Sequence, residues 1–389
     1  MPGPLPLFAA CQPGLEPFLA DEVRALGLTP NAQRGGIACS GEVRDVLRLG
    51  LWLGTASHVL MRVAEFRCRA LGELQRKAAE LPWSDWLRPR VALEVRATTR
   101  GSRIYHTGAA EERIENAIAK ALGSTPPKAH PDDDITARVH VRFRDDLCTV
   151  SLDATSTPLH RRGYRLDGRK APLREDLAHA LLLASGWTPA DALLDPFCGS
   201  GTILVEAAGL ARGLAPGRLR PPPLEHLALF DPDLWNEVRR EARGAGHAPA
   251  ICGSDRDDGA ITAARENAAR AGTADAIDLR MAAVSTQPWL RGESTPPRGV
   301  LVTNPPFGLR VAKGDGLLPL YQTLGHKAAK LGAGWRVAML VHDVRLARRT
   351  GLPLRAAFTT KHGGLTVTAM VGSTTAATTA TTAVPPTSG

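Results

Sequence analysis

The sequence predicts an α/β protein with two differently built parts, an α+β N-terminal half and an open, mostly parallel, doubly wound sheet in the C-terminal half. Three observations support this prediction. The length of 389 residues indicates two or three domains at roughly 150 residues each. After Pro172, short Val/Leu/Ile runs alternate with Ala/Leu-rich helical segments, which is typical of a parallel sheet covered by helices. Two of these runs end in short loops that combine glycine or proline with a polar side chain.

The N-terminal half is expected to contain short strands and amphipathic helices. A first unit combines a strand at residues 7–9, a helix at 14–26, a turn and strand at 34–39 and a helix at 42–53. A second combines strands near 61–66 and 91–97, helices at 71–81 and 109–122, and paired strands at 136–143 and 147–154. The sequence Arg144-Asp145-Asp146 fits a hairpin turn between the last two strands.

In the C-terminal half the expected strands are residues 192–195, 250–254, 277–281, 300–303, 335–341 and 365–370. An insertion at residues 214–235 is rich in proline, so we expect it to run over the surface as a loop with little regular structure. Residues from about Ser373 onward lack periodicity and are expected to be disordered.

The charge of the chain favours a polyanionic partner. The net charge is +9 and the pI is near 9.6, and Lys and Arg side chains bind phosphates with release of counterions. Genomic base bias toward Gly, Pro, Ala and Arg would give the same charge. A basic connector at residues 160–174 favours the first explanation, because it places six basic side chains near one acid, Asp167. Its candidate phosphate-binding residues are Arg161, Arg162, Arg165 and Lys170.

The six cysteines are scattered, without a Cys-x-x-Cys pair or a His at zinc-ligand spacing. We therefore expect reduced thiols and no metal site, with Cys198 as a structural residue rather than a nucleophile, because no base lies near it in sequence. A signal peptide and an apolar stretch of membrane-spanning length are both missing from the sequence, so a cytoplasmic protein is expected.

The first polar loop is Asp195-Pro-Phe-Cys-Gly-Ser-Gly201, between a predicted strand and a helix that begins at Thr202. Ligands bind at this edge of an open parallel sheet, glycines allow close approach of the backbone, and a helix N-terminus favours negative groups. A tight turn with glycines kept for packing is the alternative. A dinucleotide site fails because Leu204 occupies a position that should be small, and a P-loop fails because no Gly-Lys-Ser/Thr follows.

An acid that could bind both hydroxyls of a ribose is Asp255, at the end of the second predicted strand of this half. The alternative is that Asp255 caps the following helix at residues 257–271, and the sequence weighs both roles equally.

The second polar loop is Asn304-Pro-Pro-Phe307, after the fourth predicted strand. The Asn304 side-chain oxygen and the Pro305 carbonyl can accept hydrogen bonds from a planar amine, while Phe307 offers a face to an extruded base. Such an amine is a poor nucleophile. If it is the group that reacts, the site must hold it in line with the donor of the transferred group. The alternative is a proline-rich turn with Phe307 in the core.

These motifs resemble those of class I S-adenosylmethionine-dependent methyltransferases that act on nucleobase amines. Further segments resemble bacterial RNA guanine-N2 methyltransferases of the RlmL/YpsC type, which act on 23S rRNA. The matching segments are Leu159 to Arg165, Ala171 to Leu177, Ser185-Gly-Trp187, Leu7 to Glu16 and Arg34 to Ile37. The resemblance implies a Rossmann-like class I methyltransferase domain with a seven-stranded, mostly parallel sheet, preceded by an α+β ferredoxin-like unit and a THUMP domain. The implied ranges are 1–55, 56–157 and 158–372, with a tail at 373–389.

The resemblance also implies the cofactor, the substrate and the site residues. It implies S-adenosyl-L-methionine as methyl donor, N2-methylguanosine as product and structured RNA as partner, with tRNA as the alternative to rRNA and a monomer as the favoured state. The implied cofactor-binding residues are Asp195, Pro196, Phe197, Gly199, Ser200, Gly201, Thr202, Asp255, Arg256, Pro172 and Glu175. The implied catalytic residues are Asn304, Pro305, Pro306 and Phe307, and RNA is expected on Arg161, Arg162, Arg165 and Lys170.

One position departs from the family pattern. An acid that accepts from the adenine amino group usually follows the third strand, and Ala283 stands in its place. The lost hydrogen bond costs on the order of 1 kcal/mol, which weakens cofactor binding without abolishing it. Two alternatives remain at this stage: an RNA-binding protein whose methyltransferase site has decayed, and an adenine-N6 DNA methyltransferase with the same Asn-Pro-Pro-aromatic loop.

Overall fold

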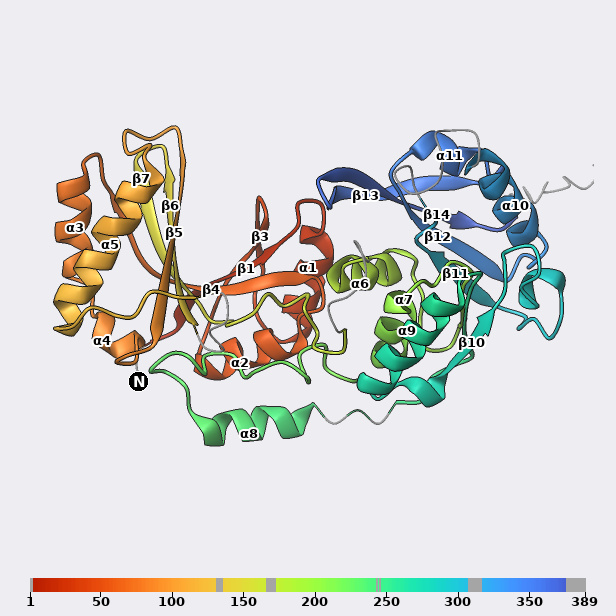
Figure 1. Ribbon diagram of the computed structural model, residues 1–389, viewed down its shortest axis with the longest axis horizontal. Helices are drawn as coiled ribbons and strands as arrows, with labels where there is room; N and C mark the ends of the chain where they lie inside the picture. Colours follow the sequence, from red (N-terminus) through yellow and green to blue (C-terminus); the bar gives the residue numbers. More distant parts are fainter. Residues whose placement is uncertain are drawn as a thin grey trace, which may run out of the picture.

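The computed structural model contains two seven-stranded sheets, one in each half of the chain. It describes residues 3–130, 136–165, 173–242, 244, 246–306 and 317–375. Figure 1 shows an elongated molecule in which the sheets form two separate lobes, with α1 of the first lobe next to α6 of the second. None of the helices in the described ranges is long and apolar enough to cross a membrane.

The N-terminal sheet is continuous across the two units predicted for this half. Its strand order is β2 (Asn31–Gln33), β3 (Gly36–Gly41), β1 (Leu5–Cys11), β4 (Ala56–Arg67), β7 (Leu147–Asp153), β6 (Thr136–Arg144) and β5 (Ala92–Arg100). Strand β4 is 12 residues long; its first half pairs with β1 and its second half with β7. A single strand therefore belongs to both units and fixes their relative position.

The helices of the N-terminal lobe are α1 (Glu16–Ala25), α2 (Val43–Trp52), α3 (Leu71–Ala79), α4 (Trp83–Trp86) and α5 (Thr107–Leu122). Figure 1 shows α3 and α5 on the same side of strands β5, β6 and β7. In β6 the odd-numbered side chains, such as Val139 and Val141, are buried, whereas Arg142 and Arg144 are exposed. This alternation is the pattern of a sheet with one covered and one open face.

The C-terminal sheet confirms the predicted fold. Its strand order is β10 (Ile277–Met281), β9 (Ile251–Asp255), β8 (Ala192–Asp195), β11 (Gly299–Thr303), β12 (Trp335–Val341), β14 (Leu365–Ser373) and β13 (Leu354–His362). The first five strands are parallel, and β14 is antiparallel to both of its neighbours. Its helices are α6 (Glu175–Ala184), α7 (Thr202–Ala211), α9 (Asp258–Arg270), α10 (Leu317–Ala329) and α11 (Val344–Arg348), with short 3-10 turns at Ala274–Ala276 and Trp289–Arg291.

Two strands were not expected from the sequence. Strand β13 is an edge strand with mixed polar and apolar residues, so it has no apolar run to mark it, and β2 is only three residues long. Conversely, β14 extends to Ser373, and the described chain ends at Thr375, so the tail expected from Ser373 onward lies almost entirely outside the described residues.

The insertion at residues 214–235 differs from its prediction. It has no helix or strand before α8 (Pro232–Glu241), as expected, but its middle is buried rather than laid over the surface. The side chains of Leu224 and Leu227 are fully buried. The Leu224 amide donates to the Ala154 carbonyl at 2.7 Å, and Leu227 forms a bridge with Leu87. The segment is therefore part of the contact between the lobes.

Helix α8 extends this contact to the ferredoxin-like unit. Arg44 of α2 forms ion pairs with Glu241 and, at 3.1 Å, with Glu237 of α8. The proline content predicted a loop on the surface. The prediction was wrong because a sequence does not show which distant surface such a segment covers.

Candidate active site

Three adjacent parallel strands bring the predicted site residues to one edge of the C-terminal sheet. Strand β8 lies between β9 and β11. Asp195 is the last residue of β8, Asp255 the last of β9, and Asn304 directly follows β11. Because the carboxyl ends of parallel strands meet at the same edge, both polar loops of the sequence analysis are next to each other here.

The glycine loop is held by one backbone and one side-chain acceptor of β9. The Cys198 amide donates to the Ser254 carbonyl at 3.0 Å, and the Gly199 amide donates to Asp255 Oδ2 at 3.0 Å. Gly199 has φ +53°, and a Cβ added to it would meet no atom of the described residues within 4 Å, so this backbone is not covered by any of them. A ligand can therefore approach the main chain closely at Gly199.

Packing fixes the other glycines of this edge. Gly201 has φ +79° and precedes α7, and a Cβ there would lie 3.0 Å from the Ala264 Cβ. A Cβ on Gly253 of β9 would come within 2.2 Å of Leu204 Cδ1. Leu204, which excluded a dinucleotide fingerprint, therefore packs α7 onto β9 through the space that Gly253 leaves. The packing interpretation of the loop is therefore confirmed at Gly201, while the ligand interpretation stays a prediction for Gly199.

Asp195 is a buried carboxyl group whose hydrogen-bond partners the sequence did not show. Its Oδ1 accepts from Thr303 Oγ1 at 2.6 Å and from the Phe197 amide at 3.1 Å. Burial and the nearby charge of Asp255 raise the pKa of Asp195 to about 7, against the effect of these hydrogen bonds. Thr303 connects the two polar loops, and its position immediately before Asn304 was the only signal for it in the sequence.

Asp255 is not the cap of α9. The cap is Asp257, whose Oδ1 accepts from the Gly259 amide at 2.9 Å. The Asp255 carboxylate instead accepts from the amides of Gly199 and Asp257, at 3.0 Å each, and it is half-buried. It thus holds the glycine loop in place and remains accessible at the strand end. Arg256, the next residue, is exposed.

Asn304 presents an acceptor that has no donor among the described residues. Its Oδ1 is buried from solvent and makes no hydrogen bond to any of them. A buried amide oxygen without a partner costs about 1–3 kcal/mol, and such an atom at the edge of a sheet points to a ligand donor. Pro305 is buried and Pro306 half-buried. Phe307 lies outside the described residues.

The end of β10 adds an apolar surface to the same edge. Met281 pairs in register with Asp255 and is 63% exposed, one of the few large apolar side chains in solvent. Ala283 follows it, and its carbonyl accepts from the Thr286 and Gln287 amides at 2.9 and 3.0 Å. The carbonyl is thus committed to a local turn and does not replace the acid missing at this position.

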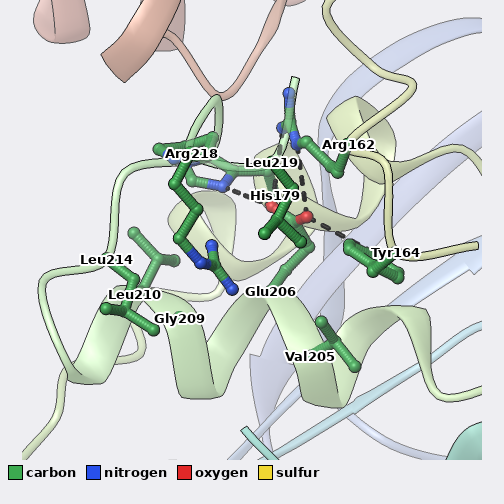
Figure 2. Close-up of a pocket in the computed structure, with 11 residues that line it drawn as sticks. Arg162, Tyr164, His179, Val205, Glu206, Gly209, Leu210, Leu214, Arg218 and Leu219 are labelled. Carbon is green, nitrogen blue, oxygen red and sulfur yellow. Dashed lines mark hydrogen bonds and ion pairs between the residues drawn. The ribbon is translucent and has the colours of Figure 1, made fainter. Parts of the chain in front are cut away.

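Arg162 corrects the prediction for the basic connector. Its guanidinium is 2% exposed, pairs with Glu206 Oε1 at 3.3 Å, and donates to the Leu159 and Gly54 carbonyls at 2.6 Å. Figure 2 shows Arg162, His179 and Tyr164 converging on the Glu206 carboxylate in a small pocket that is lined by residues between positions 162 and 219. An arginine buried in this way is not available to an RNA phosphate. Its role is to join the N-terminal lobe to α7.

The other residues of the connector divide into three groups. Arg161 is exposed. Arg165 is mostly buried: it donates to Thr202 Oγ1 at 2.7 Å and pairs at 3.3 Å with Glu175, whose pKa is raised by burial. Glu175 begins α6 and lies near the start of α7, close to the glycine loop. Lys170 and Pro172 lie outside the described residues.

An open parallel sheet with an antiparallel hairpin at one edge, a glycine loop after the central strand and acids at two strand ends defines the class I methyltransferase fold. The comparison with known families agrees. The model of the RMKL-like methyltransferase domain matches residues 162–368, so the chain belongs to this family. The RlmL ferredoxin-like domain matches residues 6–60 and the THUMP domain residues 68–153.

Similar proteins span both lobes. The chain is 36% identical over 386 residues to "Ribosomal RNA large subunit methyltransferase K/L" of Syntrophotalea carbinolica, covering 94% of this chain but 53% of that protein. The chain therefore spans about half the length of this curated relative.

Solved structures are similar over the full arrangement of the two lobes. SMU.472, a putative methyltransferase complexed with SAH, has a TM-score of 0.85 and 27% identity, with coverage of 96% of this chain and 99% of that chain. A predicted N6-adenine-specific DNA methylase from Listeria monocytogenes has a TM-score of 0.83 and 28% identity, with coverage of 94% and 96%.

Proposed function

We propose that this protein transfers a methyl group from S-adenosyl-L-methionine to the exocyclic N2 of a guanosine in structured RNA, with 23S rRNA as the substrate. The observation that carries the proposal is the unpartnered Asn304 Oδ1 beside the glycine loop. The family membership, the SAH-bound structural relative and the name of the curated relative support the same reaction.

The cofactor site that we propose follows the sheet edge. Bound there, S-adenosyl-L-methionine supplies a methyl group on a sulfonium, ready for displacement. Asp255 accepts from the ribose hydroxyls, and the backbone at Gly199 and Gly201 lies along the methionine part. The remaining proposed contacts are Asp195, Pro196, Phe197, Ser200, Thr202, Arg256, Pro172 and Glu175. Met281 covers one face of the adenine, because an exposed apolar side chain next to Asp255 is otherwise unfavourable in water.

The chain's own part in the reaction is mainly positioning. Asn304 Oδ1 and the Pro305 carbonyl accept the two hydrogens of the target amine and turn its lone pair toward the methyl carbon. The nitrogen–carbon bond forms as the sulfur–carbon bond breaks, and the amine then releases one proton to solvent. Pro305 and Pro306 hold the loop rigid, and Phe307 stacks on the extruded base.

The domain ranges 1–55, 56–157, 158–372 and 373–389 are proposed together with this function, as are a cytoplasmic location and a monomer. The exposed residue of the basic connector, Arg161, is retained as an RNA contact together with Lys170.

The test is to incubate the protein with labelled S-adenosyl-L-methionine and total RNA from a strain lacking the gene, followed by nucleoside digestion. Label in N2-methylguanosine of 23S rRNA supports the proposal. Label in tRNA would assign the alternative substrate, and N6-methyladenosine would replace the guanine assignment by the reaction named for the Listeria relative.

Calorimetric titration distinguishes an active enzyme from an RNA-binding protein with a decayed site. We expect measurable binding of S-adenosyl-L-methionine and a large loss of binding in Asp255→Ala, because the glycine loop loses the acceptor at Gly199. If the unaltered protein did not bind S-adenosyl-L-methionine, the enzymatic proposal would be wrong. Ala283 would then be the first sign of a decayed site.

A further inference from the structure

The open face of the N-terminal sheet carries an ordered set of arginines. We call this set the arginine grid; its members are Arg62, Arg67, Arg96, Arg100, Arg142 and Arg144. They come from β4, β5 and β6, and all of them except the half-buried Arg62 are exposed. The face opposite to the grid is the one covered by α3 and α5 (Figure 1).

The strand register places the grid in three rows, because directly paired residues point to the same face. The first row is Arg96, His140, Ser151 and Arg62; the second is Thr98, Arg142, Thr149 and Glu65; the third is Arg100, Arg144, Leu147 and Arg67. Along β5 and β6 the rows lie two residues apart, or about 6.6 Å at the usual rise of a strand. In β4 a bulge after Arg62 adds one residue between the first and second rows. The grid thus presents cations at a regular spacing along β5 and β6.

The charge of this face is one-sided. Among the residues of the three rows, six are arginines and one, Glu65, is a carboxylate. Glu94, two residues before Arg96 on β5, adds a second carboxylate to the same face. The covering helices are balanced, with four cations and four carboxylates in α3 and α5: Arg76, Lys77, Arg113 and Lys120 against Glu73, Glu111, Glu112 and Glu115. The positive charge is therefore a property of the open face and not of the whole lobe.

Like charges on neighbouring strands are unfavourable unless an anion lies between them. Arg62 donates to the neutral Gln33 side chain at 2.9 Å and lies 4.5 Å from the centre of the Phe8 ring. Burial lowers the pKa of Arg62 and the charge of Arg142 lowers it further, against Glu65. Arg96 pairs with Glu94 and Arg144 pairs at 3.8 Å with Asp145. The other four arginines of the grid form no ion pair within the part of the chain that the structure describes: Arg62, Arg67, Arg100 and Arg142. These four are available to an external anion.

An exposed aromatic residue lies in the loop that leaves the third row. Tyr105 is 79% exposed, the largest exposure of any large apolar residue described. Its loop is held back on the end of the sheet, since Thr99 Oγ1 donates to the Ile104 carbonyl at 2.7 Å and the Arg103 amide to Asp146 Oδ1 at 2.8 Å. A free ring on a fixed loop is suited to stacking on an unpaired base.

We propose that this face binds the substrate RNA, with the arginine grid on consecutive phosphates and Tyr105 stacked on an unpaired base. This inference rests on the proposed RNA methyltransferase function. It replaces the basic connector as the main binding surface, because Arg162 and Arg165 are held inside the protein. Contacts to phosphates set affinity and salt dependence without reading the sequence.

The experiment compares two double variants that each remove two positive charges. Arg100→Gln with Arg142→Gln alters the grid, and Arg76→Gln with Lys120→Gln alters the covered face. RNA binding is measured by fluorescence anisotropy with a 23S rRNA fragment over a range of salt. The grid variant should bind roughly tenfold more weakly, with a salt slope smaller by about 2. The control should match the unaltered protein, and Tyr105→Ala should lose affinity at an unchanged slope.

Enzyme kinetics complete the test. The grid variant should raise KM for RNA while kcat, cofactor affinity and thermal unfolding stay unchanged, which a general structural defect would not do. An unchanged KM and slope in the grid variant, or an equal loss in the control, would overturn the proposed surface. If the unaltered protein bound RNA through the grid but methylated none, the proposed function would fail while the surface stood.

Discussion

At the scale of single residues, the site contains two buried acceptors in opposite states. Asp195 Oδ1 is satisfied by Thr303 and by the Phe197 amide, whereas Asn304 Oδ1 has no donor in the described chain. The first arrangement fixes the loops, and the second leaves a hydrogen-bonding position open for a substrate. An acceptor that is already hydrogen-bonded holds the loops together, and an acceptor without a donor is open to a substrate.

Removing the open acceptor should separate chemistry from binding. In Asn304→Ala we expect unchanged affinity for S-adenosyl-L-methionine and a fall in kcat of about 100-fold, because the amine is no longer held in line. Single-turnover kinetics and calorimetry measure the two quantities. An equal loss of both would make Asn304 a cofactor-binding residue.

The raised pKa of Asp195 predicts a pH-dependent cofactor affinity. With a pKa of about 7, this carboxyl group is largely protonated at pH 6 and ionised at pH 8. If it meets the ammonium end of the cofactor, affinity should rise across this range and the rise should disappear in Asp195→Asn. Titration calorimetry at several pH values gives the profile. A profile of the same slope in both proteins would place the ammonium group elsewhere.

At the scale of elements, the sequence was most reliable where burial leaves a simple pattern. Strands β8 and β12 match their predicted bounds because buried parallel strands are mostly apolar runs. The edge strand β10 also matches, because its apolar and polar residues alternate. The edge strand β13 and the buried part of the insertion were not predicted. Which of their residues are buried depends on segments far away in the sequence, so no local pattern marks them. The two polar loops could be recognised because the residues of each are adjacent in the chain, whereas the partner of Arg162 is 44 positions away at Glu206.

The junction between α1, α6 and α7 gives a stability prediction. His179 of α6 pairs with Glu206 at 2.9 Å and with Glu22 of α1 at 3.2 Å. Burial alone would lower the pKa of His179, but these two carboxylates raise it to about 9. The folded state therefore binds the proton more tightly than the unfolded chain does. This contribution is complete below pH 6.5 and is lost as the pH rises through 9.

We expect the melting temperature of the unaltered protein to fall between pH 6.5 and 9, and His179→Asn to be less stable with a flatter profile over the same range. His247→Asn, a change at an exposed histidine, is the control and should follow the unaltered protein. Thermal unfolding followed by circular dichroism measures all three. A profile for His179→Asn that stayed parallel to the others would mean that this histidine is neutral in the folded state.

At the scale of the whole molecule, the two lobes are joined at several places in the chain. The insertion packs Leu224 and Leu227 against the N-terminal lobe, α8 pairs with α2, and Arg162 reaches the Gly54 carbonyl. Contacts of this kind oppose relative motion of the lobes, so the N-terminal lobe, on which we propose that RNA binds, keeps a fixed position relative to the site.

Loss of a buried side chain in the insertion should weaken this junction. Leu227→Ala is expected to lower the free energy of unfolding by about 2–5 kcal/mol, because the side chain is fully buried against the region of Leu87. Leu318→Ala, at a residue 37% exposed, should change it by less than about 0.5 kcal/mol. Chemical denaturation with urea provides both values. Equal effects of the two changes would show that the insertion is only loosely attached.

The shared strand β4 sets a fixed distance between the arginine grid and the junction with α6. Its 12 residues extend about 40 Å at the usual rise, from the arginine grid toward the junction with α6. On the proposed function and binding surface, a stiff arm of set length accepts only those RNAs in which a guanosine lies at the right distance from the phosphates held at the far end. Selection of the nucleotide can then depend on the three-dimensional shape of the RNA, with little need to read the bases in between.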